Sequence, residues 1–173
     1  MFDKFGELDS FEEINRMALA QREEKDEEAL MLLAEENGID KEDAEDFYDG
    51  AFDELTNAKL AAIGKLKVQC EYYDIKGILK DWVDEIVNDL NEDESLALGI
   101  RKKGKDLGQL IADFAEYGYK NRSNVSVKIV EKTTQIKKLM GARSFSIGFP
   151  DRLTRKRMTK EFFCGKEKQH DLF

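Results

Sequence analysis

The side chains best suited to nucleophilic or metal chemistry are scarce: the 173-residue chain has one histidine, His170, and two cysteines, Cys70 and Cys164. A structural zinc site needs about four nitrogen or sulfur ligands at characteristic spacing, which three such residues cannot supply. Catalysis by a serine or cysteine nucleophile needs a positioned imidazole, whereas His170 is close to the end of the sequence, where chains usually fray. No GxGxxG segment or phosphate-binding loop ending in GKS or GKT is present. We therefore expect no cofactor, no catalytic residue, no metal site of this kind and no enzymatic activity.

Carboxylates are the one reactive group present in excess, and they invite a metal interpretation. The run from Asp40 to Gly50 is acidic, but an EF-hand needs oxygen ligands at loop positions 1, 3 and 5 and a glycine at 6. With Gly50 at position 6, position 3 is Phe47, so the match fails. A magnesium site built from carboxylates alone stays open as a third, enzymatic hypothesis. Because the chain has 37 acidic residues, chance pairs on a solvated helix surface are the default interpretation.

The composition is that of a chain that can build a core. Hydrophobic residues make up 41% and charged residues 38%, with 37 acids against 28 bases and a formal charge of -9. No secretory leader and no run of about 18 apolar residues is visible, which predicts neither export nor membrane insertion. Two cysteines far apart in the sequence do not make a disulfide framework, which favours a reducing cytoplasm.

The elements that must position these residues are predicted to be mainly α, because apolar residues recur at three- and four-residue steps. We expect a helical bundle with an acidic N-terminal helical module at 1–50, a helical main domain at 51–165 with a basic C-terminal third, and a tail at 166–173. At most one short strand region is expected, near 144–149, where apolar and polar residues alternate without an obvious partner strand.

Capping residues and glycines predict the helix boundaries. Ser10 followed by Glu13 is typical of a capping box, and Gly38 is a natural helix end. The clearest apolar stripe follows Asp74, which we take as a cap, and includes Trp82. After the first helix, those expected run approximately over 26–38, 40–50, 52–71, 74–90, 94–104, 106–119, 127–140 and 150–165.

Acidic and basic residues are segregated along the chain. Residues 1–57 hold 20 acids and 5 bases, a net charge of -15; residues 58–100 come to -4 and residues 101–173 to +10. The acidic residues that we expect to bind a partner are Glu35, Glu36, Asp43, Glu45, Asp46 and Asp49. The basic residues expected to bind a partner or nucleic acid are Arg101, Lys102, Lys103, Lys105, Arg152, Arg155, Lys156 and Arg157.

This charge layout has two opposite functional interpretations and one structural interpretation. The basic third could bind the phosphates of nucleic acid, since each counterion that a Lys or Arg displaces adds affinity. The acidic opening could instead take the place of a phosphate backbone in the basic channel of another protein. The structural alternative is that the two ends attract each other or are simply solvated surface.

Several segments resemble small proteins carried by phages and conjugative elements of Firmicutes, in particular the PcfK-like group. They are the opening Met1–Asn15, MFDKFGELDSFEEIN; the run 34–46, AEENGIDKEDAED; and the basic segment 101–108, RKKGKDLG. The close from Ile147 to Gly165 is also similar to that group. Where the group usually has Gly-Ile-Pro-Gly, this chain has Gly148-Phe149-Pro150-Asp151.

Some mobile-element proteins similar to this group block CRISPR nucleases. The resemblance therefore implies a stoichiometric inhibitor of a bacterial defence nuclease, of the anti-CRISPR type and directed most readily at Cas9, which acts in the cytoplasm of the host bacterial cell. Its partner would be a Cas nuclease or another host defence protein, with nucleic acid as part of the complex and no membrane involved. The alternative is a DNA- or RNA-binding accessory protein of plasmid transfer or phage replication that works through the basic third.

Overall fold

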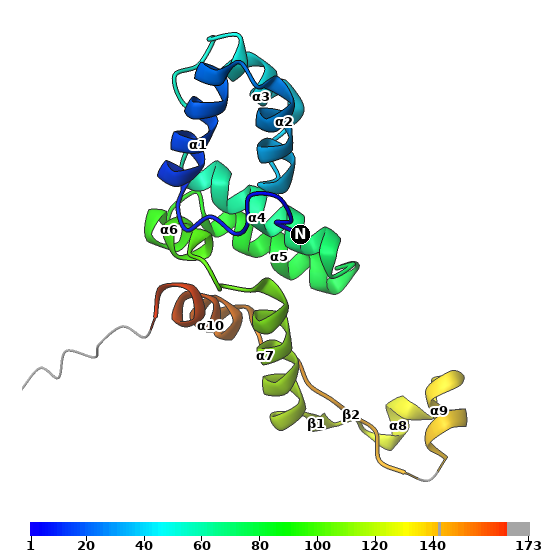
Figure 1. The fold of residues 1–173 in the computed structure, drawn as a ribbon. Helices are drawn as coiled ribbons and strands as arrows, with labels where there is room; N and C mark the ends of the chain where they lie inside the picture. The colour runs from blue at the N-terminus through cyan, green and yellow to red at the C-terminus, as the bar shows by residue number, and fades with distance from the viewer. Residues whose placement is uncertain (142, 166–173) are drawn as a thin grey trace, which may run out of the picture. The chain divides into compact units, whose positions relative to one another are not determined.

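The fold is mainly helical, as the apolar periodicity predicts (Figure 1). A computed structural model describes residues 1–141 and 143–165. Within them the helices are α1 Phe11–Glu24, α2 Glu27–Glu36, α3 Lys41–Tyr48, α4 Ala58–Tyr72, α5 Ile78–Asp89, α6 Glu94–Arg101, α7 Leu107–Lys120, α8 Val127–Val130, α9 Gln135–Met140 and α10 Arg152–Cys164. Two short strands, β1 Ser123–Asn124 and β2 Ser146–Ile147, form the sheet.

The chain divides into two compact units. Unit 1 consists of Met1–Gly108 and the segment from Thr159 onward, and unit 2 is Gln109–Met158. The acidic segment 1–50 belongs to unit 1 together with α4, α5 and α6, so the predicted boundary after residue 50 is not a boundary between these units. Unit 2 is an insertion in the sequence of unit 1, because the chain returns to unit 1 in the second half of α10.

Helices α1, α2 and α3 form a small three-helix group with its own apolar contacts. Ser10 caps α1 by accepting from the backbone N–H of Glu13 at 3.2 Å, which confirms the predicted cap. The Glu13 carboxylate accepts at 2.7 Å from the N–H of Asp9, one residue before the N-cap of the predicted capping box. Asp26 caps α2, and Gly38 follows its end with φ of +67°. Their shared core is made of Leu8, Ile14, Ala18, Leu30, Leu33, Ala34, Ala44, Phe47, Leu55 and Ala61.

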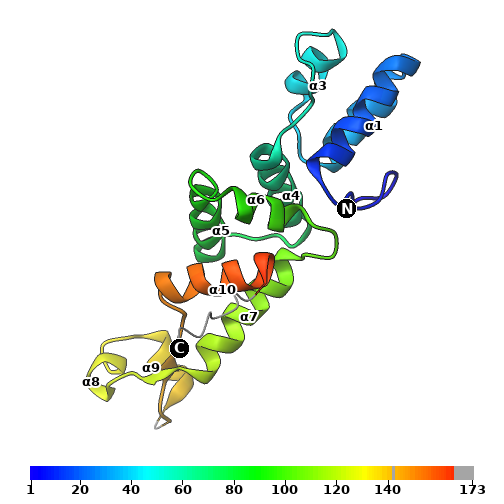
Figure 2. The same ribbon diagram turned by 90° about the vertical axis from the view of Figure 1, so that its left-hand side faces the viewer.

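The three-helix group rests directly on α4, which is why it lies in the same unit. A Cβ at Gly38 would lie 2.3 Å from the carbonyl oxygen of Gly64 in α4, so the two backbones approach closely only because both residues are glycine. Asn15 of α1 adds two hydrogen bonds of 2.9 Å with the backbone of Thr56. Helix α4 in turn packs against α5 and α6 (Figures 1 and 2).

The expected starts of α4 and α5 were wrong. Helix α4 begins after Asn57, whose side chain accepts from the N–H of Leu60, and the preceding residues from Phe52 are irregular. Asp74 does not cap a helix: its φ is +49°, its carboxylate pairs with Lys76, and α5 begins only after Gly77. At α4 a local cap therefore overrides an apolar pattern that starts earlier in the sequence, whereas α5 begins after Gly77 without a side-chain cap.

The second half of α10 completes unit 1. Phe163 is buried, with 1% of its surface exposed, and its carbonyl oxygen lies 2.8 Å from where a Cβ of Gly99 in α6 would be. Lys160 forms a 3.1 Å ion pair with Asp93, the cap of α6, and Lys105 donates to the carbonyl of Phe162 at 2.6 Å. The second half of α10 therefore contacts unit 1 at Gly99, at Asp93 and at Lys105.

Unit 2 contains the short antiparallel ladder and two short helices. Ser123 pairs with Ile147 and Asn124 with Ser146, so the predicted strand region near 144–149 is present and its partner is β1. The expected continuous helix over 127–140 was wrong, because it is divided into α8 and α9. The Thr133 hydroxyl donates to the carbonyl of Val130 and accepts from the N–H of Lys137, which replaces helical hydrogen bonds at the break.

Candidate protein-interaction surfaces

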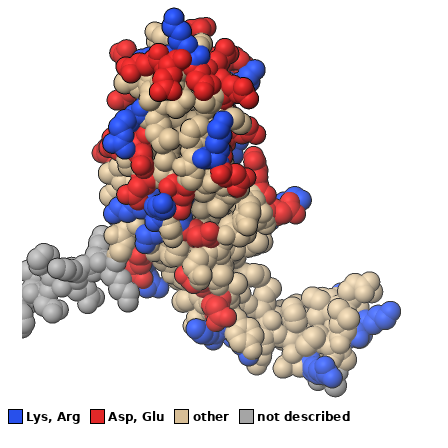
Figure 3. Space-filling view, viewed as in Figure 1, with Lys and Arg blue, Asp and Glu red and all other residues tan. Residues whose placement is uncertain are grey.

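The acidic candidates lie on the outside of the three-helix group. Glu35, Asp43, Asp46 and Asp49 are exposed, whereas Glu36 and Glu45 are half-buried. Alternation with core residues such as Ala44 and Phe47 turns the carboxylates of α3 outward. Figure 3 shows acidic side chains gathered over α1, α2 and α3.

Most of these carboxylates form no ion pair with the described part of the chain. Glu45 pairs with Lys41 at 2.9 Å, and this hydrogen bond raises the pKa of the lysine. Glu36 accepts from the N–H groups of Lys4 and Phe5 at 2.6 and 3.0 Å. The other four, Glu35, Asp43, Asp46 and Asp49, form no ion pair with any residue that the structure describes.

Arg101 must be removed from the predicted partner-binding residues, because only 1% of its surface is exposed. Its Nη2 donates to the carbonyl of Leu8 at 3.0 Å and to Oδ1 of Asn37 at 2.8 Å, while Nε and Nη1 have no hydrogen-bond partner among the residues that the structure describes. Burial lowers the pKa of Arg101 to about 10, against the opposing effect of nearby carboxylates led by Glu7. The Arg101 guanidinium therefore forms its hydrogen bonds in the interior of unit 1, where a partner cannot reach it.

The rest of this basic segment is also tied to the acidic opening. The N–H of Lys103 donates to Asp9 at 2.8 Å, and the N–H of Gly104 donates to Glu7 at 2.9 Å. The side chains of Lys102 and Lys103 are exposed and that of Lys105 is half-buried. The acidic opening and the basic segment are therefore in contact at Arg101, Lys103 and Gly104. The contact consists of hydrogen bonds from two backbone N–H groups and from Arg101 to a carbonyl, and no basic side chain of 101–105 forms an ion pair with a described acid.

Sequence reasoning missed Lys65, the buried cation at the centre of this contact. Its Nζ lies 2.6 Å from Oε1 of Glu7 and 2.7 Å from the carbonyl oxygen of Lys102, and its side chain is 0% exposed. Desolvation lowers the pKa of Lys65, and the hydrogen bond with Glu7 opposes that shift. Its position in the apolar pattern of α4, between Gly64 and Leu66, was the only available signal.

The basic candidates of α10 remain on the surface of unit 2. Arg152, Lys156 and Arg157 are exposed, and the half-buried Arg155 donates to the carbonyl of Pro150 at 2.7 Å. Unit 2 as a whole has 11 basic and 4 acidic residues, a net charge of +7, whereas unit 1 carries -16. The charge asymmetry of the sequence is thus an asymmetry between units.

Tyr73 and Tyr119 each interact with another side chain of this chain. Tyr73 donates to Asp106 at 2.8 Å, and this hydrogen bond raises the pKa of the phenol to about 12. Tyr119 is exposed, with the guanidinium of Arg122 4.1 Å from its ring centre. Arg122 also donates to the carbonyl of Tyr119 at 2.6 Å, which holds the two side chains together as a cation–π pair.

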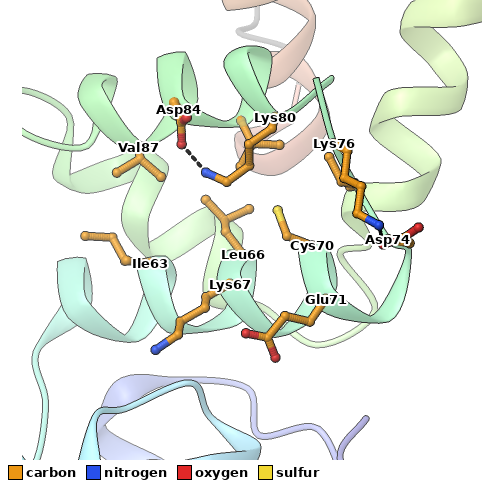
Figure 4. Close-up of a pocket in the computed structure, with 12 residues that line it drawn as sticks. Ile63, Leu66, Lys67, Cys70, Glu71, Asp74, Lys76, Lys80, Asp84 and Val87 are labelled. Atoms are coloured by element: carbon orange, nitrogen blue, oxygen red, sulfur yellow. Dashed lines mark hydrogen bonds and ion pairs between the residues drawn. The ribbon is translucent and has the colours of Figure 1, made fainter. Parts of the chain in front are cut away.

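A groove between α4 and α5 is a feature that the sequence did not indicate. It encloses about 470 Å³, within the range of ligand and peptide sites. Leu66 and Cys70 point from α4 toward α5, and the Lys80–Asp84 ion pair stands on the opposite rim from Lys67 and Glu71 (Figure 4). The apolar lining consists of Ile63, Leu66, Cys70, Ile75, Val83 and Val87.

No group of three or more His, Cys, Asp or Glu side chains is arranged to hold a metal ion among the residues that the structure describes. None of the helices in the described ranges has the length and apolarity to cross a membrane. His170 and the predicted tail at 166–173 lie outside the described residues.

Comparison with known proteins gave no relative. The chain matches no protein-family model, and searches of curated proteins and of solved structures found no match.

Proposed function

We propose that this protein is a stoichiometric inhibitor of a bacterial defence nuclease, of the anti-CRISPR type, with Cas9 as the first target to test. The acidic surface of α1, α2 and α3 would bind at or near the nucleic-acid groove of the nuclease. The protein would inhibit by occupying this groove, without catalytic turnover. It would be encoded by a mobile element and would act in the cytoplasm of the host cell.

The observation that carries this proposal is the set of four exposed carboxylates that no cation of the described chain neutralises: Glu35, Asp43, Asp46 and Asp49. They stand on a folded helical group with its own apolar core, so their spacing is fixed before binding. A preorganised acidic surface steers association with a basic groove and loses little side-chain freedom on contact. This attraction weakens with salt, because the Debye length is about 8 Å at physiological ionic strength.

The experiment measures DNA cleavage by guide-loaded Cas9 at increasing molar ratios of the purified protein, together with direct binding to the same complex. Inhibition that is complete near a fixed molar ratio, and that weakens as salt is raised, supports the proposal. The triple variant Asp43→Lys, Asp46→Lys, Asp49→Lys should lose inhibition. Its matched control, Asp81→Lys, Glu92→Lys, Glu94→Lys, makes the same change in net charge on exposed positions of unit 1 and should keep it.

Two outcomes contradict the proposal. If both triple variants inhibit equally, the acidic surface of α3 does not make the contact. If the wild-type protein neither binds nor inhibits the loaded nuclease, Cas9 is not the target, and the same pair of variants then applies to other Cas nucleases.

A second function is favoured by the net charge of +7 on unit 2 and by the exposure of Arg152, Lys156 and Arg157. In this case the protein would be a DNA- or RNA-binding accessory protein of plasmid transfer or phage replication. Binding to random duplex and single-stranded DNA at two salt concentrations tests it. Salt-sensitive binding that is lost on reversing these three charges to Glu, and kept in the α3 triple variant, would support this alternative.

A further inference from the structure

Helix α9 is an element without a core of its own. It has six residues, QIKKLM, and none of them is buried. Leu139 exposes 79% of its surface, and Val127 and Ile129 in the neighbouring α8 are also exposed. Isolated helices of this length are unstable in water, because few hydrogen bonds offset the cost of nucleation. Apolar side chains that stand out on such a helix mark a surface that another surface covers.

The charges beside these apolar residues limit what covers them. Lys137 and Lys138 precede Leu139 directly, and unit 2 has a net charge of +7. The complementary surface must therefore be apolar at its centre and acidic around it, since unlike charges favour contact and like charges oppose it.

The groove between α4 and α5 is apolar at its centre, and its rim carries three acids, Glu71, Asp74 and Asp84, beside three lysines. Its floor is aliphatic, and it belongs to unit 1, whose net charge is -16. All three lysines on its rim already pair with acids: Lys67 with Asp40, Lys76 with Asp74, and Lys80 with Asp84. Glu71 on the same rim forms no ion pair with the residues described, so it is the charge left for an incoming cation.

We infer that the groove between α4 and α5 is a self-association site that receives α9 of a second copy of this chain. Leu139 enters the aliphatic floor, and Lys137 or Lys138 pairs with Glu71. If each copy both offers its α9 and receives that of its partner, the assembly closes as a two-fold dimer with the contact made twice. This inference does not depend on the proposed function, because the residues of the contact are not those of the acidic surface on α3.

The experiment is sedimentation velocity of the full chain over a range of micromolar concentrations, at low and at high salt. We expect a concentration-dependent dimer that weakens as salt is raised. Leu139→Asp should weaken dimerisation roughly tenfold for each contact, and so about a hundredfold where the contact is made twice, taking the lower end of what burying one leucine contributes. Leu153→Asp is the matched control: Leu153 is also in unit 2 and also 79% exposed, but it lies outside α9, so this variant should dimerise as the wild type does.

Exchanging the charges across the proposed contact tests which residues of α9 face which residues of the groove. Glu71→Lys and the pair Lys137→Glu, Lys138→Glu should each weaken the dimer, and the combination should restore a substantial part of it. Circular dichroism checks that each variant keeps its helices. A wild-type chain that stays monomeric at every concentration overturns the inference, whether α9 then binds its own chain or a different protein. Equal effects of Leu139→Asp and Leu153→Asp also overturn it, because they would assign dimerisation to general apolar exposure.

Discussion

The ammonium of Lys65 lies 2.6 Å from the carboxylate of Glu7, and no part of the lysine side chain is exposed to solvent. Because Lys65 is in α4 and Glu7 is in the N-terminal segment, the ion pair fastens the acidic opening to the middle of unit 1. The carbonyl oxygen of Lys102 accepts a second hydrogen bond from the same ammonium.

The two halves of this ion pair should respond unequally to substitution. Glu7→Gln leaves a buried cation unpaired and should lower the free energy of unfolding by about 3 kcal/mol. Lys65→Met leaves Glu7, which is 20% exposed and still accepts from the N–H of Gly104, so the loss should be smaller. In urea titrations the double variant should lose less than the sum of the two. Strict additivity would show that the pair is not coupled. The deficit of Glu7→Gln should shrink as the pH rises, since a neutral amine is cheaper to bury.

Asp93 should make unit 1 sensitive to acid. Hydrogen bonds from Ser95, from Lys160 and from the N–H of Leu96 lower the pKa of its carboxyl to about 2. Because the pKa in the folded state is below the ordinary value of about 3.9, this stabilisation is present above pH 4 and is lost as the pH falls toward 2. Thermal unfolding between pH 5 and pH 2 should show a shallower decline for Asp93→Asn than for the wild type.

Replacing Asp93 by Asn or by Ala distinguishes the contribution of its negative charge from that of its capping hydrogen bond. Asn still accepts at the N-terminus of α6, whereas Asp93→Ala should cost about 1 kcal/mol even at neutral pH. An Asn variant with the same pH profile as the wild type would assign the acid sensitivity to other carboxylates.

Comparing Gly38→Ala with Gly50→Ala measures how much the close approach of the end of α2 to α4 contributes to stability. Both have positive φ, +67° and +82°, but a Cβ at Gly50 would meet nothing within 4 Å, whereas one at Gly38 would lie 2.3 Å from the carbonyl oxygen of Gly64. Gly50→Ala should cost about 1–2 kcal/mol from backbone strain alone. Gly38→Ala should cost roughly 3 kcal/mol or more, because the strain adds to the displacement of α4. Equal losses in chemical denaturation would mean that the two backbones separate easily.

Tyr73 should titrate apart from the other tyrosines of the chain, which has five. Its hydrogen bond to Asp106 raises the pKa of the phenol to about 12. This contribution to stability is present below pH 10 and is lost as the pH rises toward 12. Ultraviolet difference absorbance should show one late phenol in the wild type, absent from Tyr73→Phe and moved to lower pH in Asp106→Asn. A single transition near pH 10 in all three proteins would contradict this assignment.

Helix ends with the usual capping residues could be predicted from the sequence, whereas those set by less common local hydrogen bonds and ion pairs could not. The cap Ser10 and the helix end at Gly38 act within one helical turn, and both were predicted correctly. The start of a helix near residue 26 was also predicted, but the capping role of Asp26 was not. Asp74 has the residue type of a cap, but its pairing with Lys76 and the backbone of Gly77 move the start of α5. The break between α8 and α9 depends on the hydroxyl of Thr133, whose alternative hydrogen bonds an apolar pattern does not contain.

The candidate surfaces were predictable to the extent that they depend on charge. The exposure of Asp43, Asp46 and Asp49 follows from the spacing of α3. The burial of Arg101 does not, because its partners Leu8 and Asn37 lie 93 and 64 residues away in the sequence. The groove between α4 and α5 was not predictable for the same reason, since its two walls come from separate helices.

Phe163 has a consequence for biosynthesis. It fills part of the interior beside α6, yet it is synthesised after the residues of unit 1 against which it packs. A nascent chain that has emerged only as far as α9 therefore still shows an uncovered apolar side on its first hundred residues. Translation that stops before α10 should yield a product that chaperones and proteases treat as unfinished.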